Sequence, residues 1–326
     1  MSMLPDFRYI RPTTVADAVA ALVASPTAVP VAGASDLLPN LRRGLGNPEA
    51  LIDLAGIAAL STIEETANSW RIGAVVSLAD LVEHKGLHAV LPAIGEAALS
   101  AGGPTHRAGG TIGGNLCQDT RCMFYNQSEW WREGNDFCLK YEGDRCHVAP
   151  RTSRCFATYR GDMAPTLMVL DAKVEIAGPA GTRMIPLAEL FADDGAAHLA
   201  LAPGEILTVI EVPKADRLVA HYAKLRIRDS VDFPLVGVAA ALKRDGDKIA
   251  VLRVAITGTN SAPVVVSLLD SLVGHPWSDA AAKHLTDRLN KTAKLQNTVT
   301  TSMKYRRRVL LATARRLVEQ LWEQAV

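Results

Sequence analysis

The chain has 326 residues, enough for two or three packed domains, and its 35 basic and 34 acidic residues leave a formal net charge of +1. This near-neutral balance argues against a nucleic-acid binder. The longest uncharged apolar stretch, residues 235–242, is far shorter than the roughly 18 residues that a membrane-spanning helix needs. The first residues lack a basic region followed by an apolar stretch, so the sequence predicts no secretory signal, a cytoplasmic location and no membrane partner.

The first candidate ligand site is a turn of small residues near position 33. Residues 14–24 predict a helix that Thr14 caps, and a strand then leads into residues 31–36, with a new helix beginning at Ser35 or Asp36. Such a turn presents successive backbone N–H groups to an anion, and its small side chains let a pyrophosphate approach. The same residues also make an ordinary strand-to-helix turn, so both interpretations stay open.

A second segment, residues 101–116, is rich in glycine. Such a density of glycine lets the backbone pass close to a flat ligand or adopt positive φ angles. Thr111 and Asn115 are among its few polar side chains. An ordinary connector is the alternative, but two such segments together favour a nucleotide-like ligand. The surrounding sequence predicts strands at 50–54, 69–74 and 166–176 and helices at 77–84 and 88–100.

All five cysteines lie between positions 117 and 155, namely Cys117, Cys122, Cys138, Cys146 and Cys155. An odd number and a predicted cytoplasmic location disfavour disulfides, which leaves a metal or cluster site, redox thiols or coincidence. No Cys-x-x-Cys pair occurs, which argues against a zinc ribbon, whereas four thiolates from an irregular loop suffice for an iron–sulfur cluster. The surrounding segment is rich in aromatic residues and lacks periodicity, so a docking loop with incidental thiols is the alternative.

The last third of the chain has a different pattern. Strands at 218–227, 235–242 and 248–257 and helices at 264–274, 278–290 and 303–324 predict an antiparallel sheet backed by helices. The final helix is basic, so it faces an acidic partner, cofactor phosphates or solvent.

Several segments in order carry a family resemblance: residues 31–37, 111–117, 161–165, 170–172, 205–207, 224–228 and 305–307. As a set they resemble the FAD-carrying medium subunit of molybdenum hydroxylases, the family of the xanthine and carbon monoxide dehydrogenases. The resemblance implies an α+β fold with an FAD-binding domain of the vanillyl-alcohol-oxidase (PCMH) type over 1–215, made of subdomains 1–55 and 56–215. A C-terminal α+β domain, with an antiparallel sheet and helices, is implied over 216–326.

The resemblance also assigns contacts to FAD. The pyrophosphate would be wrapped by Val31, Ala32, Gly33, Ala34, Ser35, Asp36 and Leu37. Thr111, Gly114 and Asn115 would line the isoalloxazine and ribityl side, and Asp162 would meet a ribityl or ribose hydroxyl. Leu207 would pack on the adenine or dimethylbenzene end, and Lys224 would reach the polar edge of the flavin. No residue of this chain is implied to act on the organic substrate.

One departure from the family pattern is informative. In the family, the Asn of the flavin loop is followed closely by the Asp of the next motif, but here Asn115 and Asp162 are 47 positions apart. The inserted segment, about 118–160, contains Cys122, Cys138, Cys146 and Cys155, while Cys117 belongs to the flavin loop. Such an insert resembles that of the 4-hydroxybenzoyl-CoA reductase beta subunits of anaerobic aromatic degradation, which implies a 4Fe-4S cluster on these four cysteines beside FAD.

That resemblance implies a dimer of heterotrimers with a molybdopterin-containing large subunit, a small subunit with two 2Fe-2S clusters and a ferredoxin-like donor. Electrons would pass through the 4Fe-4S cluster and FAD to the 2Fe-2S clusters and molybdenum, where removal of the phenolic hydroxyl gives benzoyl-CoA. Two alternatives stay open. One is a medium subunit of a xanthine or CO dehydrogenase-type hydroxylase with a structural or zinc-binding insert. The other is a self-contained FAD oxidase or dehydrogenase, which the lack of a separate substrate domain disfavours.

Overall fold

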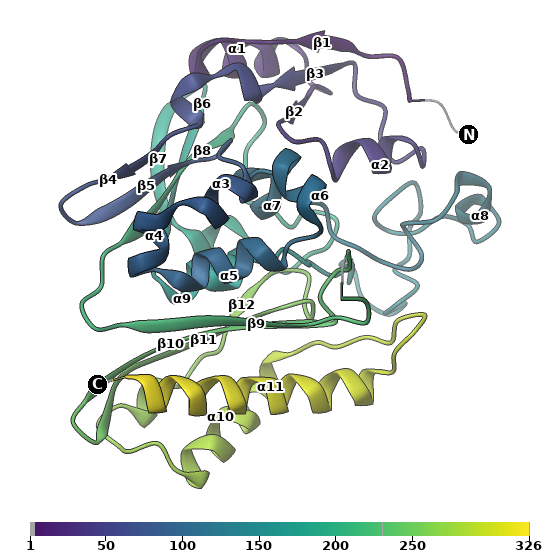
Figure 1. Ribbon diagram of the computed structural model, residues 1–326. Coiled ribbons are helices and arrows are strands. Elements are labelled where there is room, and N and C mark those ends of the chain that lie inside the picture. Colours follow the sequence, from purple (N-terminus) through teal and green to yellow (C-terminus); the bar gives the residue numbers. More distant parts are fainter. Residues whose placement is uncertain (1–3, 230, 326) are drawn as a thin grey trace.

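The computed structural model describes residues 4–229 and 231–325 and shows three sheets with their helices, arranged one above the other (Figure 1). Positions 1–3 of the predicted first subdomain, and positions 230 and 326 of the predicted C-terminal domain, lie outside the described residues. The architecture is mixed α+β, as the sequence predicts.

The N-terminal sheet has three parallel strands in the order β1-β3-β2. Their bounds are Arg8–Ile10 for β1, Val29–Val31 for β2 and Ala50–Asp53 for β3. Helix α1 (Val15–Ala24) begins after Thr14, whose hydroxyl accepts a hydrogen bond from the backbone of Asp17. Its buried face, Ala18, Val19 and Leu22, packs with Ile52 of the central strand, because apolar residues recur at helical spacing. Helix α2 (Leu37–Leu41) follows β2 after a short turn.

The second sheet has five strands in the order β4-β5-β8-β6-β7. Their bounds are Ile63–Glu65, Ser69–Gly73, Ile206–Pro213, Lys173–Gly178 and Gly181–Pro186, in that order. Short helices pack beside it: α3 (Leu78–Glu83), α4 (Lys85–Val90), α5 (Pro92–Ser100), α6 (Pro104–Gly109), α7 (Ile112–Leu116) and α9 (Met163–Val169). The 3-10 turns are Leu54–Gly56, Ala58–Leu60, Leu187–Leu190 and Asp270–Leu272.

The C-terminal sheet is antiparallel in the order β12-β11-β10-β9, with bounds Val264–Val265, Lys248–Thr257, Val236–Asp245 and Val219–Leu225. Helices α10 (Asp279–Thr292) and α11 (Met303–Gln324) cover one face, and α5 and α9 pack on the other. The side chains of strand β10 contribute to the cores on both faces of this sheet. Val238 and Leu242 belong to the core under α11, and Ala239 and Ala241 belong to the core under α9. Successive side chains of a strand point to opposite faces, so both faces here are apolar.

The inserted segment lies on the side of the molecule near α2 and α6, away from the five-stranded sheet, and carries one short helix, α8 (Glu129–Glu133) (Figure 1). Its ends are held together by paired backbone hydrogen bonds between Arg121 and Thr158. The buried guanidinium of Arg132 fastens it to the turn after α2 by donating to the carbonyls of Arg43 (3.0 Å) and Gly44 (3.1 Å). These contacts give a long irregular loop a fixed place on the fold.

Three predicted elements are wrong in part. The strand expected at 166–176 is helix α9 followed by β6, because every side chain of α9 is buried and no apolar stripe marks the helical period. The helix expected at 264–274 is a two-residue strand and a 3-10 turn. The helix expected at 88–100 is divided into α4 and α5 at Pro92, which begins the second helix.

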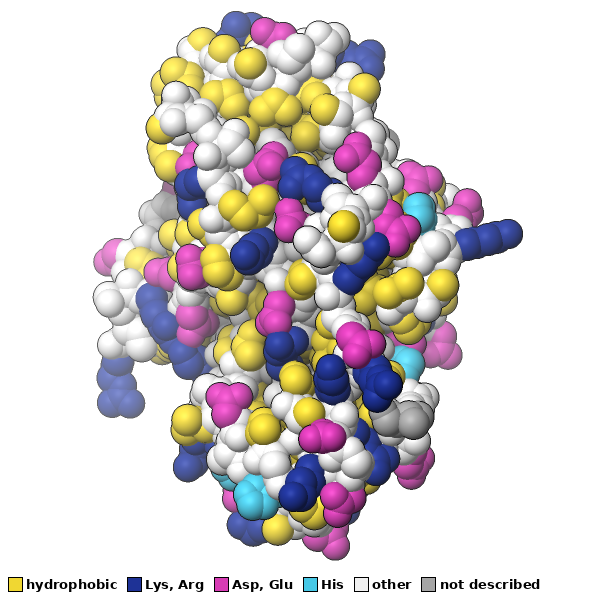
Figure 2. Space-filling model, turned by 90° about the vertical axis from the view of Figure 1, so that its left-hand side faces the viewer, with side chains coloured by type: hydrophobic (Ala, Val, Ile, Leu, Met, Phe, Trp, Pro, Cys, Tyr) yellow, Lys and Arg dark blue, Asp and Glu magenta, His cyan; other side chains and the backbone are white. Residues whose placement is uncertain are grey.

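The surface carries no dominant charge. On the face shown in Figure 2, acidic and basic side chains are interspersed over both halves of the molecule, in keeping with the net charge of +1. Within the described part of the chain, no helix is both long and apolar enough to cross a bilayer.

Candidate functional site

A cavity of about 500 Å³ lies where the turn after β2, the glycine-rich segment around α6 and α7 and the loop between β9 and β10 meet. Its volume falls in the range of cofactor sites. The structure brings eleven predicted residues to this cavity: Val31, Ala32, Gly33, Ala34, Ser35, Asp36, Leu37, Thr111, Gly114, Asn115 and Asp162. Leu207 and Lys224 are not in its lining.

The two small-residue segments touch at Gly33. A Cβ placed on Gly33 would lie 1.7 Å from the carbonyl oxygen of Gly109, so no larger residue fits without a backbone shift. Ala34, the next residue, has a φ angle of 56°, in the left-handed region that non-glycine residues seldom adopt. The tight turn therefore places small side chains and main-chain groups on the cavity wall, an arrangement suited to a closely approaching phosphate.

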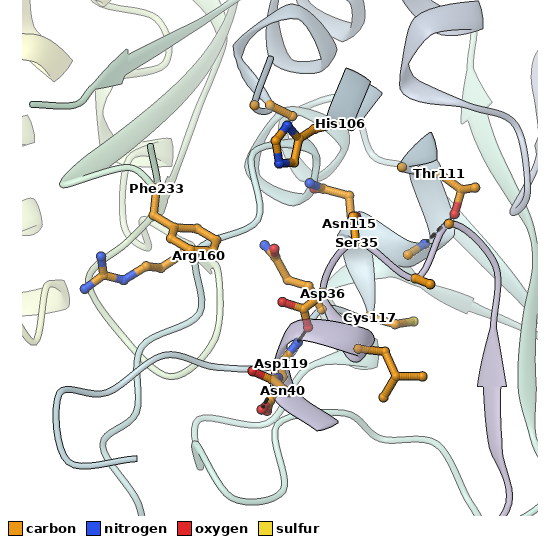
Figure 3. A pocket seen from close by; sticks show the side chains of 18 of the residues that line it. Ser35, Asp36, Asn40, His106, Thr111, Asn115, Cys117, Asp119, Arg160 and Phe233 are labelled. Carbon is orange, nitrogen blue, oxygen red and sulfur yellow. Dashed lines mark hydrogen bonds between the residues drawn. The ribbon is translucent and has the colours of Figure 1, made fainter. Parts of the chain in front are cut away.

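Short helices set the polar groups on the opposite wall (Figure 3). The Thr111 hydroxyl accepts a hydrogen bond from the backbone N–H of Gly114 at 3.0 Å and so caps the start of α7. The Asn115 Oδ1 accepts from the backbone N–H of Met163 at 3.0 Å, the first residue of α9. Asn115 thus joins α7 to α9 through a residue 48 positions away in sequence and keeps its place at the cavity.

Asp36 lies on the cavity wall but its carboxylate is engaged elsewhere. It accepts a hydrogen bond from the backbone N–H of Asp119 at 2.9 Å and forms an ion pair with Arg121. Burial raises the pKa of Asp36, and the positive charge of Arg121 opposes this rise. The carboxylate therefore serves to hold the start of the insert against the turn, and Arg121 offsets a negative charge that would repel a phosphate.

Asp162 and Lys224 form a buried ion pair, with Nζ and Oδ2 3.0 Å apart and both side chains less than a tenth exposed. The Tyr222 hydroxyl also donates to Asp162, at 2.7 Å, and Lys224 donates to the carbonyl of Ser100 at 2.8 Å. Burial raises the pKa of Asp162, and Lys224 and Tyr222 counter that rise. Lys224 thus lies behind Asp162 as seen from the cavity, and its expected contact with the polar edge of the flavin stays a prediction.

Leu207 also lies outside the lining of the cavity, and its expected contact with the cofactor stays a prediction. It is buried in β8 opposite Ile176 and belongs to the core of the five-stranded sheet. Its alternation with outward-facing residues along the strand directs it into the core and away from the cavity.

Sequence reasoning missed several lining residues: Asn40, His106, Asp119, Arg121, Tyr125, Arg160, His198 and Phe233. Arg160 and Phe233 lie together on one side of the cavity in Figure 3, and the Nε of Arg160 is buried without a hydrogen-bond partner. Two of these residues lie close to a predicted motif in sequence: Asp119 is two positions after Cys117, and Arg160 directly precedes the motif of Asp162. Phe233 reaches the site only through the packing of the C-terminal domain.

Four of the five cysteines surround a second, small cavity of about 10 Å³, which has room for about one water molecule. Cys122, Cys138, Cys146 and Cys155 all line it, together with Lys140 and His147. Cys117 lines the first cavity instead, which is the division that the sequence predicts. Among the described residues, no three His, Cys, Asp or Glu side chains form a group that could hold a metal ion.

The surroundings of these thiols contain groups that favour a thiolate. Burial raises the pKa of Cys122, but the backbone N–H groups of Phe124 and Tyr125 act against this rise. Burial raises the pKa of Cys155 to about 12, opposed by the backbone N–H of Ala157 and the charge of Lys140. Bound metal would supply the positive charge that makes thiolates favourable in such a site.

Comparison with known proteins agrees with this architecture. The family described as "FAD binding domain in molybdopterin dehydrogenase" matches residues 5–215, and the "CO dehydrogenase flavoprotein C-terminal domain" matches residues 220–321. The fold is thus that of a flavin-binding oxidoreductase subunit. The chain is a member of the FAD-binding family of molybdopterin dehydrogenases.

Among curated relatives, the aldehyde oxidoreductase FAD-binding subunit PaoB of Escherichia coli K12 is 34% identical, over 81% of this chain and 85% of that protein. The carbon monoxide dehydrogenase medium chain of Afipia carboxidovorans is 29% identical, over 87% of this chain and 81% of its own. A crystal structure of Cu,Mo-CO dehydrogenase superposes with a TM-score of 0.81 at 27% identity, covering 99% of this chain and 100% of that one.

Proposed function

We propose that this chain is the electron-transfer subunit of a molybdenum enzyme complex, with FAD in the first cavity and a 4Fe-4S cluster in the second. The proposal rests on how the structure distributes the five cysteines between the two cavities. Cys117 lines the flavin cavity, and Cys122, Cys138, Cys146 and Cys155 line one separate cavity within the insert. A cluster of this type is held by four thiolates, each bound to a different iron.

The proposed FAD contacts follow the lining of the first cavity. Residues 31–37 would hold the pyrophosphate, and Thr111, Gly114 and Asn115 would contact the flavin side. Asp162 would meet a hydroxyl of the cofactor, with Lys224 holding its carboxylate in place. FAD would exchange two electrons and the cluster one at a time, which suits a subunit that joins one-electron and two-electron carriers.

The proposed cluster would lie between the four thiols that line the second cavity. The thiols lie on loops, and the single helix of the insert, α8, is five residues long. We expect the cluster and the insert to stabilise each other, as metal binding and folding are coupled in other small metal sites.

The proposed partners follow from the names of the relatives, which are subunits or medium chains of larger enzymes. We propose a large molybdopterin-containing subunit and a small subunit with two 2Fe-2S clusters, assembled as a dimer of heterotrimers in the cytoplasm.

Two reactions are candidates for the whole complex. The cluster-bearing insert favours 4-hydroxybenzoyl-CoA reductase activity, with electrons entering from a ferredoxin-like donor. The relative named as an aldehyde oxidoreductase subunit favours the alternative, a hydroxylase of the xanthine or CO dehydrogenase type in which electrons leave through FAD. In that alternative the insert is structural or binds zinc.

The test is the cofactor content of anaerobically purified protein. We expect one FAD, about four iron and about four acid-labile sulfur per chain, the composition of one 4Fe-4S cluster. Zinc in place of iron, or neither metal, would exclude the cluster and leave FAD binding unaffected. Assays of the whole complex with 4-hydroxybenzoyl-CoA plus reduced ferredoxin, and with aldehydes plus an oxidising dye, then decide between the two reactions.

A further inference from the structure

The two cavities share a wall formed by one aromatic side chain. Among the described residues, Tyr125 is the one that lines both the larger cavity and the cavity of the four cysteines. Its side chain is only 8% exposed, and it packs with Cys138 and Leu45. The ring therefore fills the space between the two sites, and solvent does not.

Backbone geometry fixes Tyr125 relative to a cysteine. The backbone N–H groups of Tyr125 and Asn126 donate to the carbonyl of Cys122 at 3.2 and 3.0 Å, and the Asn126 side chain accepts from the backbone N–H of Cys122 at 2.9 Å. This turn ties the ring to the position of a thiol three residues earlier. Movement of Cys122 and movement of the ring are thereby coupled.

The buried ammonium group of Lys140 packs against the face of the Tyr125 ring. The Lys140 Nζ lies 4.3 Å from the centre of the Tyr125 ring, a cation–π geometry. The same ammonium donates to Asp119 Oδ1 at 2.5 Å and to the carbonyl of Thr120 at 3.2 Å. Lys140 lines the cysteine cavity and Asp119 lines the flavin cavity, so their ion pair crosses the same wall. Lys140, held by Asp119 and by the carbonyl of Thr120, therefore fixes the orientation of the ring.

We infer that Tyr125 is the electron-transfer contact between the 4Fe-4S cluster and FAD. This inference rests on the proposed function of the two cavities. Electron tunnelling weakens steeply across space without packed atoms, and an aromatic ring in contact with both sites replaces such a gap. Each electron that leaves the reduced cluster arrives on FAD, two for full reduction of the flavin, and Tyr125 itself is neither oxidised nor reduced. The same path serves the reverse direction.

The test uses the purified complex loaded with both cofactors. A short pulse of a one-electron reductant is followed by absorbance at flavin and cluster wavelengths, which gives the rate of electron equilibration between the two centres. Tyr125→Phe keeps the ring and should keep the rate near that of the wild type. Tyr125→Leu removes the ring and should slow equilibration several-fold, with both midpoint potentials unchanged. Tyr141→Leu is the matched control, because Tyr141 lies in the same insert but lines neither cavity.

The outcomes separate this inference from the proposed function. Wild-type protein without iron would overturn the proposed function before any variant is made. An unchanged rate in a fully loaded Tyr125→Leu protein would overturn the role of Tyr125 alone. If Tyr125→Leu loses iron, Tyr125→Met replaces it, since methionine fills irregular space without a ring. Iron loss from both ringless variants, with Tyr125→Phe still loaded, would identify Tyr125 as a structural support and would also overturn the inference.

Discussion

Gly33 and Gly109 lie in direct contact: a Cβ on Gly33 would be 1.7 Å from the Gly109 carbonyl oxygen, whereas a Cβ on Gly109 would be 3.9 Å from the Gly33 carbonyl oxygen. The contact holds the turn after β2 against the glycine-rich segment, and both border the larger cavity, where we propose that FAD binds. Because only a Cβ on Gly33 would clash, substitutions at the two glycines test whether this close approach positions the turn.

Gly33→Ala should therefore separate the two segments and lower FAD content. An added methyl group in such a packed place costs about 1–3 kcal/mol, and the displaced turn would no longer face the pyrophosphate. The flavin-to-protein absorbance ratio and urea unfolding measure the two effects. Gly109→Ala is the control and should retain FAD, so an equal loss in both variants would show that the contact does not position the turn.

Asn115→Leu should lower both FAD content and stability. The substitution leaves the backbone N–H of Met163 without its acceptor, which costs about 1–3 kcal/mol for a buried group. Asn115→Asp keeps an acceptor oxygen of the same shape and should retain more flavin. Equal flavin content in all three proteins would exclude Asn115 from the site.

Each of four single substitutions by serine should cause loss of iron, because a hydroxyl is a poor ligand for cluster iron. The four positions are Cys122, Cys138, Cys146 and Cys155. Cys117→Ser should retain the iron, since that thiol lines the other cavity. Iron and acid-labile sulfur analysis of the five purified variants measures this. Loss of iron with Cys117→Ser and its retention with Cys122→Ser would contradict the assignment of the four ligands.

Asp162→Asn should destabilise the protein strongly, because it leaves Lys224 as a buried cation without its partner. Breaking a buried ion pair from one side costs about 3–5 kcal/mol. The double variant Asp162→Asn with Lys224→Met should recover part of this loss in urea unfolding. No recovery would mean that Asp162 acts through Tyr222 rather than through Lys224.

Glu96 and His221 should make stability depend on pH. Their side chains lie 2.7 Å apart, between α5 and β9. The hydrogen bond that the Glu96 carboxylate accepts from the imidazole raises the pKa of His221 above 6.5, although burial opposes it. Burial acts to raise the pKa of Glu96, but the hydrogen bonds with His221 and the Tyr222 N–H outweigh it and lower that pKa below 4.5.

The directions of these two pKa shifts determine how the stability of the protein depends on pH. The pair contributes fully between the ordinary pKa values of the two groups, roughly pH 4.5 to 6.5. The contribution is lost as pH rises through the raised pKa of His221, and also as pH falls through the lowered pKa of Glu96. Because both side chains are partly exposed, its size is about 1 kcal/mol or less. His221→Gln should therefore destabilise the protein more at about pH 6 than at about pH 9; an equal loss at both values would exclude the charge effect.

The sequence by itself determined the family, the mixed α+β architecture and the order of the main elements. Periodicity fixed α1, α11 and the long strands of the C-terminal sheet, because each of these has a regular apolar pattern. Residues 31–37, Thr111, Gly114 and Asn115 were predicted from the sequence as site residues, and the structure brings them to one cavity. Helix α9 was not predictable, because burial on all sides removes the stripe that marks a helix.

Only the tertiary structure decided which residues share a wall. Leu207 and Lys224 belong to matching motifs, but strand alternation directs one into the core and an ion pair holds the other behind Asp162. Tyr125 and Lys140 carry no motif, because their place depends on how an irregular insert folds against a turn far away in sequence. Local patterns specify helices and strands, whereas contacts between distant loops depend on the packing of the whole chain.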